Sequence, residues 1–217
     1  CIPHEIKVPD NLPLGCTRIV LPLAAGAREE ADSRGERLIN VMPFLRQVRK
    51  VELKNSEGSS FSLETHVVKS IKDEEESVVI EIVEFAGVKH VRGGTLRLLR
   101  FRKEGGTEQL CIYLAPDGMP AHWEDAFEKD IFAVLPLSVH LGCGIGVSHH
   151  FELQSGRTHL IDPEGNRPLF EDVANLLRSL PKAIDCCIRE GNRPSDVLLR
   201  FWSILRWNRG DKETFLI

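Results

Sequence analysis

The sequence predicts an α+β fold with a mostly antiparallel β-sheet and helices gathered at the C-terminal end. Five β-rich segments follow one another between residues 48 and 115, separated by short polar turns. Such short connections favour an antiparallel meander, because parallel strands need long crossovers. Helical periodicity dominates the last third of the chain. The 42% hydrophobic content of the 217 residues supports a substantial core.

Two elements are expected before the meander. TRIVLPL (17–23) is β-branched and apolar and ends at Pro22, which is typical of a buried strand. After a polar segment that suggests a loop or frayed helix, apolar residues recur at helical spacing from Glu36 to Val48. They are Leu38, Ile39, Met42 and Leu45. We therefore expect one amphipathic helix over 36–48, kinked or delayed by Pro43.

The meander strands are predicted from their β-branched and aromatic content. They are VRKVELKN (48–55), SFSLETHVVKSI (60–71), SVVIEIVEF (77–85), TLRLLRFRK (95–103) and EQLCIYLA (108–115). In the last of these, Leu110, Ile112 and Leu114 share one face, which predicts a half-buried strand. The acidic run KDEEE (72–76) is interpreted as a solvated hairpin tip without function.

A glycine-rich segment follows the meander and the polar, helix-like stretch PAHWEDAFEKD. It joins two short strands expected in IFAVLPLSVH (131–140) and VSHHFEL (147–153). The pattern G-x-G-x-G at 142–146 lacks the lysine of a P-loop and the following helix of a dinucleotide fold. A tight strand-to-strand bend therefore explains these glycines better than a phosphate-binding loop does.

Two C-terminal helices are predicted. The apolar face of the first crosses Pro181, which kinks or splits it, and consists of Val173, Leu176, Leu177, Leu180, Ile184, Cys187 and Ile188. The second begins near 192–195, with Asn192 as a cap and Pro194 in the first turn. It is expected to bury Val197, Leu198, Phe201, Trp202 and Leu205.

Composition excludes several classes of protein. The formal net charge of −4 argues against a dedicated nucleic-acid binder, which usually carries a basic excess. No stretch approaches 18 uninterrupted apolar residues, so no membrane span is expected. The N-terminus lacks a signal peptide and an initiator methionine, which suggests a piece excised from a longer protein.

Cysteine and histidine usage favours a reduced, intracellular chain, cytoplasmic or nuclear, without zinc. None of the cysteines forms a C-x-x-C pair; they are Cys1, Cys16, Cys111, Cys143, Cys186 and Cys187. His149 and His150 are adjacent on an expected strand, so they point to opposite faces and cannot share one metal ion.

Three segments together resemble the GHKL ATPases, most closely the large sacsin-like and heat-shock-chaperone-like members. Residues 15–23 (GCTRIVLPL) resemble the strand "G-T-x-x-x-L-P-L" that closes the ATPase domain, although Cys16 interrupts the G-T pair. INVMPFLRQVRKVEL (39–53) resembles the helix and first strand that open the adjoining middle domain. Residues 131–160 resemble the "F-x-L-P-L … F-x-L-x-x-x-R" strands of that same domain.

The resemblance implies a transducer region that couples ATP binding in an upstream domain to conformational change. It implies closing strands of the upstream domain at 1–24, a transducer-like α+β domain at 25–165 and a helical segment at 166–217. The Glu, Asn and Asp-x-Gly residues of a GHKL site have no counterpart in this chain. ATP and Mg²⁺ would therefore bind only through the upstream domain, and the isolated chain would not be an enzyme. The parent ATPase could be active or degenerate.

Arg157 is the candidate site residue that the resemblance implies. In the chaperones an arginine in "L-x-x-S-R" reaches the γ-phosphate, and LQSGR matches this segment with Gly156 inserted between Ser155 and Arg157. The alternative is a surface arginine with no catalytic part. The implied partners are the upstream GHKL nucleotide-binding domain, protein clients and, for the parent protein, a second copy of itself.

Two other functions stay open from the residues alone. A protein-interaction module could use aromatic and arginine anchors near the C-terminus: Phe201, Trp202, Arg206, Trp207 and Arg209. Burial of Phe201 and Trp202 in the domain's own core is the expectation that opposes it. A hydrolase could use His159 and Asp162 as an acid–base pair, but the sequence supplies no nucleophile or metal site for it.

Overall fold

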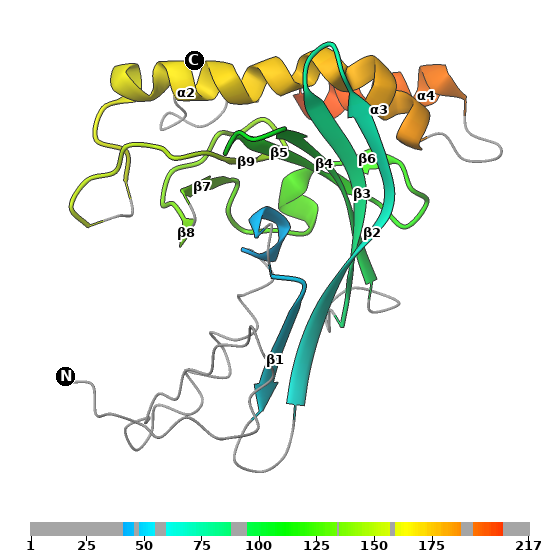
Figure 1. The fold of residues 1–217 in the computed structure, drawn as a ribbon, viewed down its shortest axis with the longest axis horizontal. Coiled ribbons are helices and arrows are strands. Elements are labelled where there is room, and N and C mark those ends of the chain that lie inside the picture. The colour runs from blue at the N-terminus through cyan, green and yellow to red at the C-terminus, as the bar shows by residue number, and fades with distance from the viewer. Residues whose placement is uncertain are drawn as a thin grey trace.

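The computed structural model describes residues 41–45, 48–54, 60–87, 95–133, 135–156, 159–187 and 193–205. Within these residues the chain forms a mostly antiparallel nine-stranded sheet, three α-helices and short 3₁₀ segments. All three α-helices follow the last strand in sequence, and they lie on one side of the sheet, with α4 beside α3 (Figure 1). The predicted α+β fold, with helices at the C-terminal end, is confirmed.

A five-stranded meander forms the greater part of the sheet. Its strands are β1 (Lys50–Lys54), β2 (Ser60–Asp73), β3 (Val78–Ala86), β4 (Thr95–Lys103) and β5 (Gln109–Leu114). Each strand pairs antiparallel with the next. The predicted bounds differ from these by no more than two residues. The predicted bounds agree closely because strand composition and polar turns are local features of the sequence.

The four remaining strands are short. They are β6 (Pro120–Ala121), β7 (Ile131–Ala133), β8 (Leu135–Pro136) and β9 (Gly146–Ser148). β9 pairs antiparallel with β5, whereas β7 lies parallel to β9. The glycine-rich segment connects β8 to β9, which are not neighbours in the sheet, so it does not close a hairpin. β7 lies between them, antiparallel to β8 and parallel to β9.

The sheet carries a hydrophobic core on each face. On the helix side, Leu110, Ile112 and Leu114 of β5 pack with Val173 and Phe201. On the other face, Cys111 packs in a second cluster rich in aromatic side chains, namely Phe44, Phe85, Trp123, Phe127 and Phe132. The prediction of a half-buried β5 is therefore wrong: as a central strand, β5 is covered on both faces.

The first predicted helix is split at its proline. It consists of α2 (Pro163–Asn175), the 3₁₀ segment η4 (Leu176–Ser179) and α3 (Leu180–Cys187). Pro181 lies in the first turn of α3, where the missing N–H removes no helical hydrogen bond. Val173, Leu176 and Cys187 are buried in the helix-side core, as expected. Residues on both sides of position 166 share this single core.

The last helix, α4 (Pro194–Leu205), buries a narrower face than its sequence suggests. Val197, Phe201 and Ile204 are buried at i, i+4 and i+7. Leu198 is 39% exposed and Trp202 is 66% exposed, so the prediction that both are buried is wrong. One residue on a helix turns the side chain by about 100°, which carries Trp202 away from the stripe that holds Phe201. The proposed cap Asn192 lies outside the described residues.

The chain enters the sheet through a short 3₁₀ helix, η2 (Met42–Phe44). Leu45 is already extended (φ −81°, ψ 113°), so the helix predicted to continue to Val48 is wrong there. Pro43 lies in the first turn of η2, where proline is tolerated, so it does not explain the early end. The strand expected at 17–23 and residues 36–40 of the predicted helix lie outside the described residues.

Buried polar side chains hold η2 against the sheet. Arg100 donates from Nη1 to the carbonyl oxygen of Pro43 at 3.1 Å, and Gln109 donates from Nε2 to that of Phe44 at 3.0 Å. The Arg100 and Arg102 guanidinium groups both donate to Glu81 Oε2, at 2.8 and 3.2 Å. Burial opposes ionisation of Glu81, but hydrogen bonds from Arg102 and the charge of Arg100 outweigh it and lower its pKa. Sequence analysis did not identify this cluster.

The acidic run forms a turn between β2 and β3, as predicted, and Glu74 and Glu75 at its tip are exposed. Asp73 at its base is different, because it is only 3% exposed. Its Oδ1 accepts a 2.5 Å hydrogen bond from Lys182 Nζ on α3. This bond lowers the pKa of Asp73. The tip is therefore tethered to the helix layer by an ion pair.

Candidate functional site

The hairpin between β9 and α2 is the part of the structure that carries the sequence-predicted site. Leu153 and Leu160 form an isolated antiparallel bridge. Two backbone bonds flank it, from Gln154 N to His159 O at 2.9 Å and from Ile161 N to Glu152 O at 3.0 Å. Arg157 itself lies outside the described residues, so the structure fixes its flanks and not its side chain.

Polar residues occupy the described part of the hairpin tip. Gln154, Ser155, Gly156 and His159 are all exposed. Both sides of the stem, in contrast, insert one apolar residue into the helix-side core, Phe151 and Leu160. The Phe151 ring lies against Phe170 of α2 with a centroid distance of 4.6 Å. The described residues of the tip are thus polar and face solvent, on a stem that is fixed in the core.

Asn166, in the second turn of α2, ties the stem to the helix. Its side-chain oxygen accepts from Glu152 N at 2.7 Å. Its amide nitrogen donates to the carbonyl oxygens of Glu152 and Asp162, at 3.2 and 2.9 Å. These contacts lie immediately before and after the hairpin. Sequence analysis missed Asn166, because a lone asparagine in a helical segment gives no periodic signal.

Asp162, one half of the alternative acid–base pair with His159, caps a helix. Its Oδ1 accepts from Glu164 N at 3.0 Å, and Pro163 follows at the first helical position. Capping by Asp before Pro is a standard start of a helix. The same signal was used at 192–195 and could have located the start of α2 from the sequence. The cap accounts for Asp162 without a catalytic part.

His149 is held by hydrogen bonds at both ring nitrogens. Its Nδ1 accepts from His150 N at 2.9 Å and lies 3.1 Å from Thr107 Oγ1. Nδ1 is therefore the acceptor, so the proton lies on Nε2, which is 3.5 Å from Asp172 Oδ2 on α2. The neighbouring His150 is exposed; both histidines follow β9, which ends at Ser148, so the strand expected over 147–153 is wrong beyond that residue. His149 is a structural histidine that joins β9 to α2.

The glycine-rich bend has a packing explanation. Gly142 and Gly144 have φ values of 70° and 62°, which favour glycine. Gly146 lies against the fully buried Trp123, where an added Cβ would come within 2.6 Å of the indole ring. Asp130 Oδ2 accepts from the backbone amides of Leu141 and Gly142 at 2.8 and 3.1 Å, while burial raises the Asp130 pKa. A structural bend therefore accounts for these glycines.

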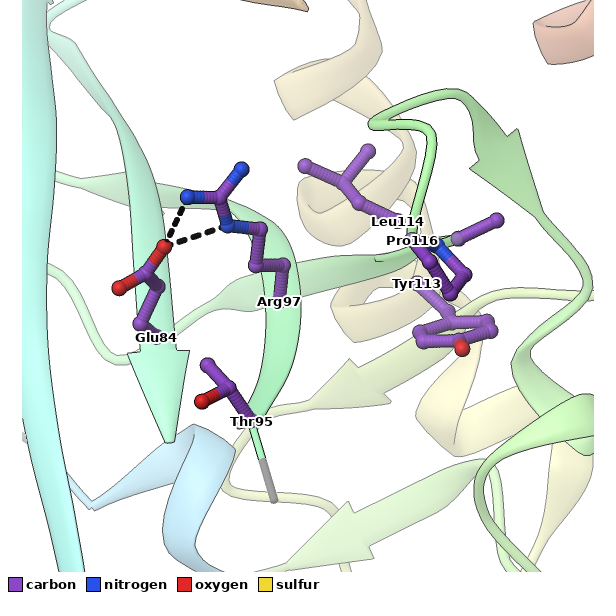
Figure 2. A pocket seen from close by; sticks show the side chains of 7 residues that line it. Glu84, Thr95, Arg97, Tyr113, Leu114 and Pro116 are labelled. Atoms are coloured by element: carbon purple, nitrogen blue, oxygen red, sulfur yellow. Dashed lines mark hydrogen bonds and ion pairs between the residues drawn. The ribbon is translucent and has the colours of Figure 1, made fainter. Parts of the chain in front are cut away.

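A hollow of about 290 Å³ lies on the sheet, over the ends of β3, β4 and β5 (Figure 2). Its lining is formed by Glu84, Thr95, Arg97, Tyr113, Leu114, Ala115 and Pro116. Arg97 forms an ion pair with Glu84, its cross-strand neighbour. The two charges compensate each other, so the hollow does not favour an anion. Its volume is at the lower end of the range for small-molecule sites.

The described cysteines and acidic residues do not form a nucleophilic or metal centre. Burial raises the pKa of Cys111 and of Cys143 to about 12, so both stay protonated thiols at neutral pH. In the part of the chain that the structure describes, no three His, Cys, Asp or Glu side chains are grouped to hold a metal ion. No described helix is long and apolar enough to cross a membrane.

Comparison of the chain with protein-family models, with curated proteins and with solved structures finds no match.

Proposed function

We propose that this chain is the transducer-like middle region of a GHKL-type, sacsin-like ATPase. In this proposal an upstream domain binds ATP with Mg²⁺, and the middle region converts its nucleotide state into conformational change or partner binding. The protein would act inside the cell, in the cytoplasm or nucleus. The isolated chain would not hydrolyse ATP, because the upstream domain supplies the catalytic carboxylate and the nucleotide pocket.

The observation that supports the proposal most is the construction of the hairpin around position 157. The described tip residues, 154–156 and 159, are exposed, and they stand on a stem whose residues Phe151 and Leu160 are buried. A residue that contacts a phosphate held by another domain must be accessible and yet well positioned. An arginine suits the contact, because it is always charged and its fork of donors can hold two phosphate oxygens. It would stabilise the charge on the transferred phosphoryl group.

The test is ATP turnover by the native protein that carries this sequence. We expect Arg157→Ala to lower kcat about 10³-fold, as loss of an arginine that contacts the transferred phosphoryl group does elsewhere. Arg157→Lys should retain part of the activity, since it keeps the charge without the fork. Arg167→Ala is the matched control, because Arg167 is an exposed arginine on α2 paired with Glu171. Unchanged turnover in Arg157→Ala would overturn the proposal.

A second candidate function is a protein-interaction module, favoured by the exposure of α4. Leu199 and Trp202 are 67% and 66% exposed, three positions apart on the same helix. Large exposed apolar residues at this spacing are typical of a helix that binds a partner. The function would not depend on nucleotide.

The test is quantitative co-purification of partners with the native protein. We expect the double variant Leu199→Ala/Trp202→Ala to lose partners, whether or not ATP is present. Arg200→Ala, at an exposed polar position between them, is the control. An identical set of partners for wild type and double variant would contradict this second function. Loss of partners only in the presence of ATP would favour the transducer function instead.

A further inference from the structure

The two edges of the sheet differ in how far they are covered. β8 forms one edge with only two residues, one of which is Pro136. Short edge strands and prolines protect an edge against pairing with another chain. At the other edge, among the described residues, β1 pairs only with Ser60–Glu64, although β2 continues to Asp73 (Figure 1). The second half of β2 is therefore itself an edge of the sheet.

The uncovered segment of β2 is His66–Asp73, which we call the open edge. Thr65 N still donates to the Arg49 carbonyl oxygen at 2.7 Å, and beyond Thr65 no described strand pairs with this side of β2. Residues 66–70 are all exposed; Val67 is 49% and Val68 54% exposed. The backbone groups of an edge strand are a template for another strand. The open edge is longer than the usual strand of about 5–6 residues, so it offers a full length of pairing.

A β-bulge at Val68 reverses the side-chain alternation along the open edge. Val67 lies opposite Val83, which belongs to the aromatic-rich core, whereas Lys69 lies opposite Ile82, which packs on the helix-side core. Without the extra residue, Lys69 would share the face of Val67. The register with β3 is regular again from Lys69 onwards, so the strand beyond the bulge has ordinary pairing geometry.

The two lysines of the open edge are directed away from it. A lysine that projects beyond an edge strand hinders pairing with another chain. Lys69 is directed to the helix side instead, where its Nζ donates to the Asp185 carbonyl oxygen of α3 at 3.3 Å. Lys72 Nζ lies 2.7 Å from Glu104, which follows β4, two strands further into the sheet. Neither charge therefore blocks a strand that approaches the open edge.

The two ends of the open edge carry opposite charges. Arg49 and Lys50 are exposed at the end beside β1, and Glu74 and Glu75 are exposed at the hairpin tip. From Thr65 to Glu74 the strand spans about 30 Å, at about 3.3 Å per residue, so these groups cannot pair within one chain. When two copies lie antiparallel, the basic end of each lies beside the acidic tip of the other. This complementarity identifies a second copy as the occupant of the open edge.

We propose that two copies of this chain associate through the open edge, with β2 of one copy antiparallel to β2 of the other. The arrangement is twofold symmetric, so every contact is made twice. The axis passes near Lys69 and Ser70, in the middle of the open edge, and the sheet continues from one copy into the other. This association goes beyond the proposed function and does not rest on it.

The first test adds a charge to the open edge of the native protein that carries this sequence. Val68→Lys changes an exposed side chain beside the axis, so both copies then carry a lysine there. We expect the Kd for self-association to rise about 10-fold, because like charges meet across the pair. Leu135→Lys is the matched control, because Leu135 is a 57% exposed apolar residue on the opposite edge strand. It should leave Kd at the wild-type value.

Sedimentation equilibrium measures both Kd values, and hydrogen exchange of β3 and β4 shows that the variants are folded. An unchanged Kd in a folded Val68→Lys protein would overturn the proposal. So would a wild-type protein that remains monomeric at about 0.1 mM.

Exchanging the charges at the two ends tests the antiparallel direction. Arg49→Glu should raise Kd about 5-fold, because two symmetric surface ion pairs are lost. Glu74→Lys with Glu75→Lys should have a similar effect, and all three changes in one chain should restore the wild-type Kd. The ends are too far apart to restore a contact within one copy, so rescue requires the other copy. Losses of affinity that simply add in the combined variant would overturn this arrangement.

Disulfide formation locates the contact even where the protein has other interfaces. Ser70→Cys places the two new thiols beside the axis, whereas His66→Cys leaves them about 23 Å apart along the strands. We expect Ser70→Cys to give a disulfide-linked dimer on mild oxidation and His66→Cys to give only the background of the unmodified protein. Equal yields from the two variants would overturn the proposed pairing. A disulfide from Ser70→Cys to a different protein, in place of a second copy, would overturn the choice of occupant.

Discussion

The helices α2 and α4 lie in the same layer and both bury apolar side chains in the helix-side core, but α2 has side-chain hydrogen bonds in addition. Asn166 bonds α2 to the two ends of the hairpin, and Asp172 lies 3.5 Å from His149 just after β9. α4 is attached through a stripe of apolar residues that includes Phe201, and its opposite face is exposed. The first attachment specifies a direction, because hydrogen bonds are angular, whereas the second mainly provides stability.

This difference matches the two parts that the proposed functions assign to the helices. A helix that must report the position of a loop needs contacts that fix geometry, as in α2. A helix that offers a surface needs one well-anchored face and one free face, as in α4. The sequence describes both only as amphipathic helices.

The largest expected effect separates the two faces of α4. Phe201→Ala should lower the free energy of unfolding by about 3–5 kcal/mol, because it leaves a cavity in a fully buried site. Trp202→Ala, one residue further along, should change it by no more than about 0.5 kcal/mol, because the side chain is exposed. Urea unfolding of both variants measures this. Similar losses would mean that α4 is buried on both faces.

A second prediction concerns the support beneath the end of α4. A Cβ on Gly144 would come within 2.8 Å of the Ile204 carbonyl oxygen and 2.6 Å of His122 Nδ1. We expect Gly144→Ala to lower the free energy of unfolding by about 1–3 kcal/mol through this overpacking and its positive φ.

Gly105→Ala is the matched control for this prediction. Gly105 also has a positive φ, of 73°, but no atom lies within 4 Å of its Cβ position. It should show the smaller loss that backbone strain alone produces, about 1 kcal/mol. Equal losses of unfolding free energy in the two variants, measured by thermal or urea unfolding, would show that the contact with α4 is not the cause.

The smallest expected effect concerns the ion pair between Lys182 of α3 and Asp73, which is charged, whereas the hydrogen bonds of Asn166 on α2 are neutral. The hydrogen bond from Lys182 lowers the Asp73 pKa in the folded state. A lowered folded pKa contributes stability above the ordinary pKa of about 3.9, and that contribution is lost as the pH falls through the folded value.

Asp73→Asn should therefore lower stability at pH 7 and flatten the stability–pH curve below about pH 4 relative to wild type. Urea midpoints of the two proteins between pH 7 and pH 2.5 measure the difference. The contact should also weaken in high salt, because Lys182 is partly exposed. A difference between the proteins that stays constant across this pH range would contradict the tether.

Much of the fold could be predicted from the sequence because its signals are local. The meander strands β1 to β5 were located by β-branched composition and polar turns, and Pro181 was correctly placed at a break in the helix. The candidate site was harder to predict from the sequence. The role of Arg157 is implied by a family resemblance and stays a prediction. The hydrogen bonds of Asn166 could not be predicted, because their partner Glu152 is fourteen residues away in the sequence.

The sequence by itself determined the order and type of the main elements, since strand and helix periodicities and turn residues act over a few neighbouring residues. Only the tertiary structure decided that β7 lies parallel to β9, that Trp202 faces outward and that Asn166 is fully buried. Each of these depends on which surface a distant segment covers. Burial and hydrogen-bond partnership are properties of the assembled layers, and no local pattern encodes them.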